Sequence, residues 1–150
     1  MGANGRTFKL ADDDENGYLA PAKERPPTLL EPEKGPYTQS SGMLSYYEIC
    51  RNINDYNWTE VWLDEGKVPY AYGHGQWNPQ WVGYDNQESI LYKIEMAKDY
   101  NLGGIMWWSA DMDDFTVSHF LSCQLIYAVN KLKRILFTKN EHDRKIYGRG

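Results

Sequence analysis

The residues best suited to chemistry in this 150-residue chain are three carboxylates, Asp111, Asp113 and Asp114, which directly follow a short apolar run. Two neighbouring carboxyl groups can serve as the acid and as the base or nucleophile in the hydrolysis of a glycosidic bond. Short acidic side chains at the end of an element also accept hydrogen bonds from backbone amides and so stabilise a loop. We favour this second, structural role for the three aspartates.

The segment before these acids predicts the element that presents them. The run Gly103–Trp108 is apolar without polar alternation, which is typical of a parallel strand buried on both faces. Residues 88–100, just upstream, predict a helix. A helix, a glycine turn and a buried strand form the repeating unit of a parallel sheet or barrel, in which side chains at the carboxyl end of a strand face the ligand site. Trp108 and the acids lie at that end.

The predicted helix carries signals for its start and for its buried side. Asp85 and Glu88 have the spacing of a capping box, with Asp85 as the N-cap. Ile90, Ile94 and Ala97 fall on one stripe of the helix surface. We therefore expect the helix to begin after Asp85 and to pack against the protein through this stripe.

The rest of the chain predicts a small mixed unit. Residues 1–10 contain the end of a strand, residues 43–54 predict a helix, and short strands are expected at 59–63, 68–72 and 81–84. One helix with antiparallel strands fits a small α+β unit, and an acidic, proline-rich loop over residues 12–36 precedes it. Residues 124–132 have the periodicity of a further helix.

No metal or cofactor site is expected. The acidic stretch from Asp12 begins like a calcium loop, but Lys23 stands where that loop requires a glutamate. The three histidines, His74, His119 and His142, lack metal-ligand spacing with one another and with the cysteines. No phosphate loop, nucleotide-binding fingerprint or Ser-His-Asp set is present in the sequence.

Composition and charge limit the classes of partner that the chain can have. The chain is 41% hydrophobic and 25% charged, which fits a globular protein with one modest core. Residues 1–130 have a net charge of −10 and residues 131–150 one of +5; the acidic body argues against nucleic acid as a partner. No run approaches the roughly 18 apolar residues of a transmembrane helix, so no membrane partner is expected.

Four motifs, taken together, resemble one known family. Residues 5–10 spell Gly-Arg-Thr-Phe-Lys-Leu, and residues 42–50 spell Gly-Met-Leu-Ser-Tyr-Tyr-Glu-Ile-Cys. Residues 67–72 spell Lys-Val-Pro-Tyr-Ala-Tyr and are followed by Gln-Trp-Val-Gly-Tyr-Asp at 80–85. Residues 103–115 contain Gly-Gly-x-Met-x-Trp and then Asp-x-Asp-Asp-Phe. In content and order these motifs resemble family 18 of the glycoside hydrolases, the chitinases and chitinase-like lectins.

The resemblance implies a fold of the α/β class. It assigns the chain to a partial (β/α)₈ TIM barrel, comprising its last strands and helices, with a small α+β domain inserted. A whole barrel typically needs about 250 residues, so we expect the chain to be the carboxyl-terminal part of a larger protein or a truncated relative. Residues 1–10 would end the seventh strand, 11–84 form the inserted domain, 85–135 the last helix-strand-helix, and 136–150 a basic and possibly disordered tail.

The resemblance also implies which part of the activity is missing. The family's catalytic acid is a glutamate that ends an Asp-x-x-Asp-x-Asp-x-Glu motif on the fourth strand, and its nucleophile is the acetamido oxygen of the substrate. No such motif occurs in these 150 residues. We therefore expect no catalytic residue and no activity in this chain alone, with no cofactor involved.

Three residues match positions that line the family's binding cleft for chitin or a chito-oligosaccharide. Trp108 corresponds to the tryptophan that floors a sugar subsite, Met106 to the methionine beside it, and Arg6 to an arginine of the cleft wall. Trp107 should point to the other side of the strand and pack against helices. Two departures alter the wall: Asn4 stands where members commonly carry tyrosine, and Ser40 (outside these matches) where many carry glutamate.

The family also implies an extracellular parent protein. Cys50 and Cys123 fall where members often join the inserted helix to the loop after strand eight by a disulfide. The sequon Asn57-Trp58-Thr59 is compatible with glycosylation at Asn57. No signal peptide is visible, because the first 20 residues contain no apolar core region.

Three hypotheses remain open on the sequence. The leading one is the carboxyl-terminal segment of a secreted chitinase that hydrolyses β-1,4-linked N-acetylglucosamine polymers. The alternative is a non-catalytic chitin-binding lectin on the same scaffold, which would differ at the fourth strand, outside this sequence. A third, weaker one is a complete small protein without a sugar-related function.

Overall fold

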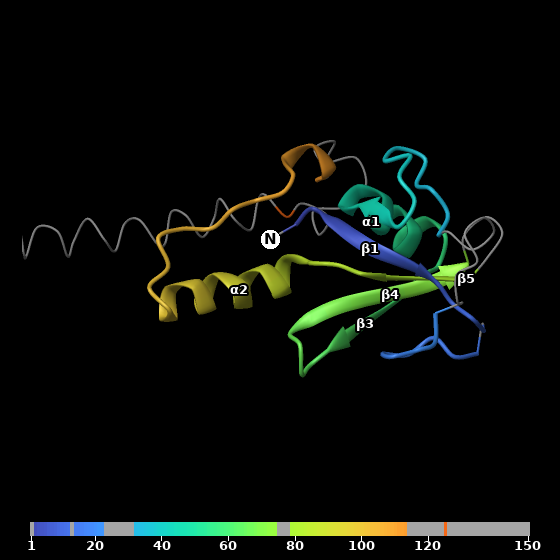
Figure 1. Cartoon of the computed structure of the whole chain (residues 1–150), viewed down its shortest axis with the longest axis horizontal. Coiled ribbons are helices and arrows are strands. Elements are labelled where there is room, and N and C mark those ends of the chain that lie inside the picture. The colour runs from blue at the N-terminus through green and yellow to red at the C-terminus, as the bar shows by residue number, and fades with distance from the viewer. Residues whose placement is uncertain (1, 13, 23–31, 75–78, 114–124, 126–150) are drawn as a thin grey trace, which may run out of the picture.

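A five-stranded antiparallel sheet forms the body of the protein (Figure 1). The computed structural model describes residues 2–12, 14–22, 32–74, 79–113 and 125. The strands are β1 (Asn4–Lys9), β2 (Met43–Ser45), β3 (Thr59–Leu63), β4 (Val68–His74) and β5 (Pro79–Gly83). They lie in the order β2-β1-β5-β4-β3, so β1 has a hydrogen-bonded neighbour on each side.

One helix covers one face of this sheet. The helix α1 (Tyr46–Asp55) follows β2 directly, and its Ile49 belongs to the same buried core as Leu44, Ala71 and Val82 of the strands. Ala71 and Val82 are cross-strand partners, so they point to the same side of the sheet. Because successive side chains of a strand point to alternate faces, the residues next to Ala71 on β4 and next to Val82 on β5 face the opposite side of the sheet.

Most of the expected strands are confirmed, and two of them differ in length. The strand at 59–63 has the predicted bounds, whereas 68–72 extends to residue 74 and the strand expected at 81–84 spans 79–83. The helix predicted over 43–54 begins at Tyr46 instead. Its first three residues form β2, because the backbone of β1 lies beside them and supplies hydrogen-bond partners.

A buried carboxylate ties α1 to the loop before β2. Glu48 is 2% exposed and completes a capping box in which Ser45 is the N-cap. Its Oε1 accepts hydrogen bonds from the amides of Tyr37 (2.7 Å) and Thr38 (2.9 Å), and its Oε2 accepts from the Ser45 amide (2.8 Å). A Cβ atom at Gly35 would lie 2.3 Å from this carboxylate, so the glycine allows the loop to approach.

The second helix, α2 (Gln87–Asp99), confirms the helix predicted over 88–100, but its N-cap lies one residue later than predicted. Its N-cap is Asn86, whose side chain accepts from the Ser89 amide at 3.0 Å, and Ser89 returns a bond to the Asn86 amide. Asp85, the predicted N-cap, is instead a buried acceptor for the Ser89 hydroxyl at 2.9 Å and for Lys93. The predicted stripe is confirmed at Ile90 and Ile94, which are buried.

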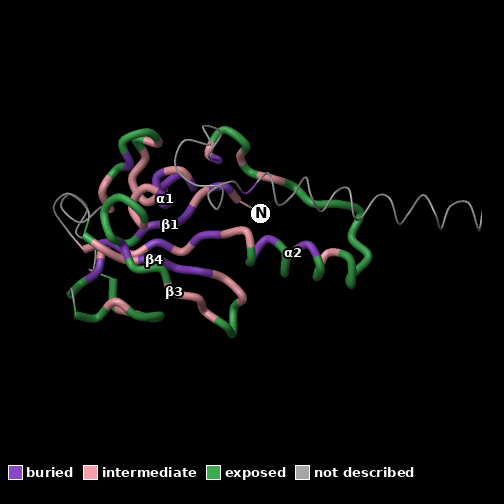
Figure 2. The backbone as a smooth tube through the Cα atoms, turned by 180° about the vertical axis from the view of Figure 1, so that it is seen from behind, coloured by how far each residue is buried: buried purple, intermediate pink, exposed green. Residues whose placement is uncertain are grey.

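The expectation of a buried strand at Gly103–Trp108 is wrong for the part of the chain that the structure describes. After α2 the chain runs back along the helix, and Figure 2 shows this segment exposed along most of its length. Met106 is 68% and Trp108 64% exposed. A strand is buried on both faces only when strands and helices cover it, and here the segment makes a single parallel bridge, between Trp108 and Gly2.

Several sequence predictions fall on residues that the structure does not describe. They include the helix over 124–132, of which only Leu125 is described and buried, and the tail at 136–150. The division into barrel and inserted domain also stays a prediction, and β1 itself hydrogen-bonds to strands of the expected inserted domain. Among the described helices, none is long and apolar enough to cross a membrane.

The Glu48 contacts predict a large stability effect of a single substitution. Glu48→Ala removes the acceptor of three backbone amides, two of which belong to the loop, so the free energy of unfolding should fall by about 3 kcal/mol. Urea denaturation monitored by circular dichroism measures it. The control Glu95→Ala, at an exposed position of α2, should change stability by less than about 0.5 kcal/mol. Equal effects of the two substitutions would contradict the role assigned to Glu48.

Candidate functional site

The sheet face opposite α1 carries a cavity of about 480 Å³. Arg6 of β1 lines it together with Tyr70 of β4 and Trp81 of β5. Tyr18, from the loop after β1, contributes a further aromatic ring to its lining and is 55% exposed. Asn4, at the start of β1, also lines the cavity. An apolar and aromatic wall with a few polar groups is typical of a site for a small organic ligand.

The register of three strands explains why these side chains meet. Gly83 of β5 lies opposite Arg6 of β1 on one side and opposite Tyr70 of β4 on the other. A Cβ atom at Gly83 would lie 3.0 Å from the six-membered ring of Trp81, so the indole leans over the glycine. It stacks on Tyr70 with ring centroids 5.3 Å apart and an interplanar angle of 21°. Phe8 packs against the same indole at 6.1 Å.

The charged groups of the cavity are of two kinds. Lys93 forms an ion pair with Asp85, so these two charges offset each other. Arg6 is exposed, and among the described residues none forms an ion pair with it. Its guanidinium therefore remains able to donate hydrogen bonds to a ligand.

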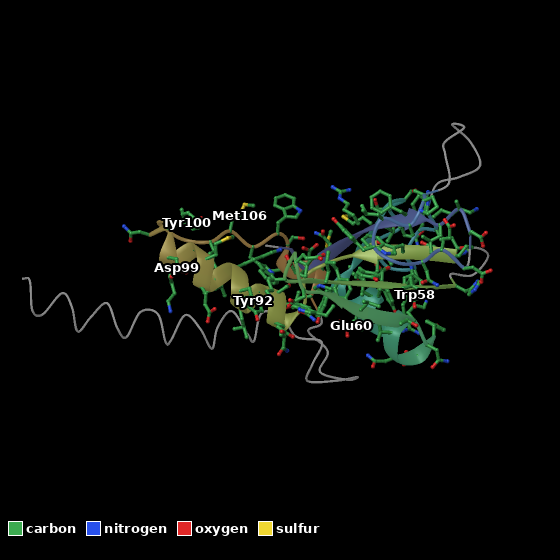
Figure 3. All side chains as sticks on the ribbon, turned by 90° about the horizontal axis from the view of Figure 1, so that it is seen from below. Trp58, Glu60, Tyr92, Asp99, Tyr100 and Met106 are labelled. Carbon is green, nitrogen blue, oxygen red and sulfur yellow. The ribbon has the colours of Figure 1, made fainter. Side chains whose placement is uncertain are left out.

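The start of β1 connects this cavity to the segment that carries Trp108. The Ala3 amide donates to the Trp108 carbonyl at 3.1 Å, and Asn4 Nδ2 approaches the same oxygen at 3.4 Å. The indole of Trp108 is exposed, whereas Trp107 packs against the buried core. The two indoles therefore differ in burial in the predicted sense, although the segment does not form the predicted strand. Met106 lies further back along the exposed segment that runs beside α2 (Figure 3).

The three aspartates after Trp108 differ in their surroundings. Asp113 is buried, and its Oδ1 accepts a hydrogen bond from the Leu125 amide at 3.0 Å, so the predicted structural role is confirmed for this residue. Asp111 is exposed in the short 3₁₀ helix η1 (Ala110–Met112). Asp114 lies outside the described residues.

The other predicted sites lie away from the cavity. Cys50 is buried in the core on α1, while Cys123 falls outside the described residues, so their pairing stays a prediction. Asn57 is exposed in the turn between α1 and β3. His74 is exposed at the end of β4. Ser40, one of the two family departures, lies in the loop before β2.

Sequence reasoning missed the aromatic part of this site. Trp81 and Tyr70 belonged to predicted strands, but their meeting depends on the register, which places Gly83 between Arg6 and Tyr70. Tyr18 was assigned only to a loop of no particular function. Alternation within a predicted strand shows which of its residues share a face. It does not show how strands pair with one another, so it could not bring Trp81 and Tyr70 together.

Comparison with known proteins identifies the family. Residues 1–113 match the family described as glycosyl hydrolases family 18. The chain belongs to glycosyl hydrolase family 18. This family 18 chain is 37% identical over 118 residues to an endochitinase of Manduca sexta, an alignment that covers 74% of the chain and 19% of the endochitinase.

Solved structures agree with this assignment. Human YKL-39, described as a pseudo-chitinase with retained chitooligosaccharide-binding properties, superposes with a TM-score of 0.70 and 38% identity, covering 87% of this chain and 33% of that one. A group IV chitinase of Ostrinia furnacalis, solved in complex with allosamidin, gives 0.72 and 34%, covering 89% and 34%. The family 18 chain thus spans about a fifth of the endochitinase and about a third of each solved chain.

Tyr84, which lines the cavity, predicts a pH dependence of stability. Burial and the nearby Glu60 carboxylate, to which the phenol donates at 2.5 Å, raise the pKa of Tyr84. Because the unfolded chain ionises near pH 10, the folded state is stabilised below that pH and loses this contribution as the pH rises above it. The free energy of unfolding should therefore fall between about pH 9 and 11.

Urea denaturation of the wild type and of Tyr84→Phe over this pH range tests this expectation. The variant lacks the hydroxyl, so its stability should depend less steeply on pH, while the other tyrosines contribute to both proteins alike. Parallel pH profiles for the two proteins would show that Tyr84 does not carry the effect.

Proposed function

We propose that this chain supplies part of the sugar-binding cleft of a chitinase-type glycoside hydrolase. In the full-length protein the cleft binds β-1,4-linked N-acetylglucosamine polymers and hydrolyses them. Trp108, Met106 and Arg6 of this chain contact the sugar, and the catalytic acid comes from elsewhere. The observation that carries the proposal is the exposed indole of Trp108, attached through the start of β1 to the strand that places Arg6 in an aromatic cavity.

The chemistry of the site supports a carbohydrate. A pyranose ring presents an apolar face, which stacks on an indole, and a rim of hydroxyl groups, which accept hydrogen bonds from a guanidinium. The site offers both, and its Lys93–Asp85 pair leaves little net charge besides Arg6. An uncharged polar ligand fits this balance better than a polyanion. Of two similar proteins, human YKL-39 is described as retaining chitooligosaccharide binding, and the Ostrinia furnacalis group IV chitinase was solved in complex with allosamidin.

The exposed surface of α2 supports a larger fold around the chain. Large apolar side chains on α2 and the segment after it are exposed, namely Leu91, Tyr92, Met96, Tyr100, Leu102, Ile105 and Met106. Monomeric proteins rarely leave so many neighbouring apolar side chains uncovered. We infer that the remaining strands and helices of a (β/α)₈ barrel cover this surface in the full-length protein, which would also bury the segment at 103–107. An extracellular location, a Cys50–Cys123 disulfide and a glycan on Asn57 belong to the same proposal.

A non-catalytic lectin on the same scaffold is the second candidate. The similarity to human YKL-39, described as a pseudo-chitinase that retains chitooligosaccharide binding, favours it. The two candidates share the binding site and differ in the acid that protonates the leaving group. Turnover of a chromogenic chitobioside by the full-length protein distinguishes them, since a lectin would bind the compound without cleaving it.

The 150-residue chain alone should not hydrolyse chitin. General acid catalysis contributes a large part of the rate of such enzymes, about 100-fold or more, and the sequence contains no Asp-x-x-Asp-x-Asp-x-Glu motif. The assay compares release of chromophore from a chitobioside by the isolated chain and by buffer. Turnover above the buffer rate would mean that an acid within the chain is catalytic, and Asp111→Asn and Asp114→Asn would then identify it.

The two adjacent tryptophans should respond differently to truncation. In the full-length protein, Trp108→Ala removes an exposed ring, so it should weaken binding of a chito-oligosaccharide by about 1–3 kcal/mol, by analogy with stacking on bases, and leave the melting temperature nearly unchanged. Trp107→Ala leaves a gap beside the core and should lower stability by about 3 kcal/mol. Calorimetric titration and thermal melting of both variants measure these effects. Loss of binding only in Trp107→Ala would assign the sugar to the opposite face of the segment.

A further inference from the structure

We propose that Trp81 is a second sugar-stacking residue, which binds a ring of the chito-oligosaccharide beyond the one on Trp108. The inference rests on the proposed function and extends it, because it assigns a longer ligand to the same cleft. Nothing in the sequence motifs gave Trp81 a role of this kind. The basis for this role is the position of Trp81, which lines the cavity on the sheet face opposite α1.

The indole of Trp81 is held in place from two sides. Tyr70 stacks on it at 5.3 Å and 21°, and Phe8 packs against it at 6.1 Å. Gly83 leaves the space over which the six-membered ring leans. A ring fixed in this way loses little conformational entropy when a ligand stacks on it. Trp81 is only half-buried and lines the cavity, so part of the indole remains accessible.

Arg6 lies where it can complete the contact. It is placed directly across from Gly83, over which the indole leans, and both Arg6 and Trp81 line the cavity. A sugar ring on the indole would therefore have the guanidinium beside its hydroxyl groups. A flat apolar surface next to a planar donor is the combination that a pyranose requires. The same arginine would contact the sugar from the side while the two tryptophans hold successive parts of the ligand.

The spacing along β1 separates the two tryptophans by more than one ring. Asn4 lies beside the Trp108 carbonyl at 3.4 Å, and Phe8 is four strand residues further along β1, about 13 Å. Trp81 is the cross-strand partner of Phe8 and lies about 5 Å to its side, on β5. The two steps are perpendicular, so together they place Trp81 about 14 Å from Asn4, which is more than the length of two pyranose rings. A disaccharide on Trp108 would therefore not reach Trp81, whereas a tetrasaccharide would.

The alternative is a purely structural role, in which Trp81 only packs between Phe8 and Tyr70. Two substitutions in the full-length protein separate packing from stacking. Trp81→Leu keeps an apolar side chain against Tyr70 but removes the flat surface, and Trp81→Phe keeps a smaller flat surface. The matched control is Trp62→Leu, because Trp62 also forms a ring pair, with Tyr92 at 6.1 Å, but does not line the cavity.

The experiment measures affinity for chitobiose and chitotetraose by isothermal titration calorimetry. Trp81→Leu should weaken binding of chitotetraose at least about fivefold, the lower end for loss of one aromatic stacking contact, and leave chitobiose unaffected. Trp81→Phe should lie between the wild type and the leucine variant. Trp62→Leu should bind both sugars like the wild type. Labelling with 5-fluorotryptophan adds a direct readout, in which the ¹⁹F signal of Trp81 shifts with chitotetraose and not with chitobiose.

The outcomes separate this inference from the proposed function. If the wild type binds chitotetraose and the Trp108 signal shifts, while the Trp81 signal and the affinity of Trp81→Leu stay unchanged, Trp81 only packs and this inference fails alone. If the wild type binds neither sugar, the proposed function and this inference fail together. Should Trp81→Leu not fold, the Phe variant and the ¹⁹F signal of the wild type still decide the matter.

Discussion

The strand β1 is the element on which the rest of the structure depends. It hydrogen-bonds to β2 along one edge and to β5 along the other, and the residues at its start bond to the Trp108 carbonyl. These three sets of contacts fix α1, the β3–β4–β5 sheet and the exposed segment after α2 relative to one another. They also fix the distance between Trp108 and Arg6, because both are attached to one short strand. The geometry of the candidate site follows from the backbone of β1 more than from any single side chain.

Local patterns in the sequence were sufficient where the deciding contacts are local. The strand at 59–63 and the buried stripe of α2 at Ile90 and Ile94 were predicted correctly, since alternation and helical periodicity act within a few residues. The N-cap of α2 was displaced by one residue, from Asp85 to Asn86. Asp85, Asn86 and Ser89 are all good capping residues, and the choice among them depends on Lys93, which holds Asp85 as its ion-pair partner.

Prediction failed where the deciding contacts are distant in sequence. The apolar run at 103–108 has the composition of a buried strand, but burial requires neighbours, and the described part of the chain provides only the bridge to Gly2. Residues 43–45 follow a helical pattern locally and still form a strand, because β1 lies beside them. The aromatic group of Trp81 and Tyr70 was missed for the same reason, since strand register brings them together. Trp108 and Arg6 were predicted as binding residues through a family resemblance, which already contains such distant contacts.

The position of β1 also has a consequence for how the chain acquires its structure during synthesis. Among the described strands β1 emerges first, and its partners follow about forty residues later in β2 and almost eighty residues later in β5. The β3–β4 and β4–β5 pairs, by contrast, join strands that are near neighbours in the sequence. Such long-range pairing slows folding, and the edge of β1 that faces β5 remains open to other strands until β5 is complete. The charged side chains of Arg6 and Lys9 on that strand would disfavour pairing with the wrong chain during this interval. β1, which joins β2 to the rest of the sheet, is thus among the last of the described strands to be paired on both sides.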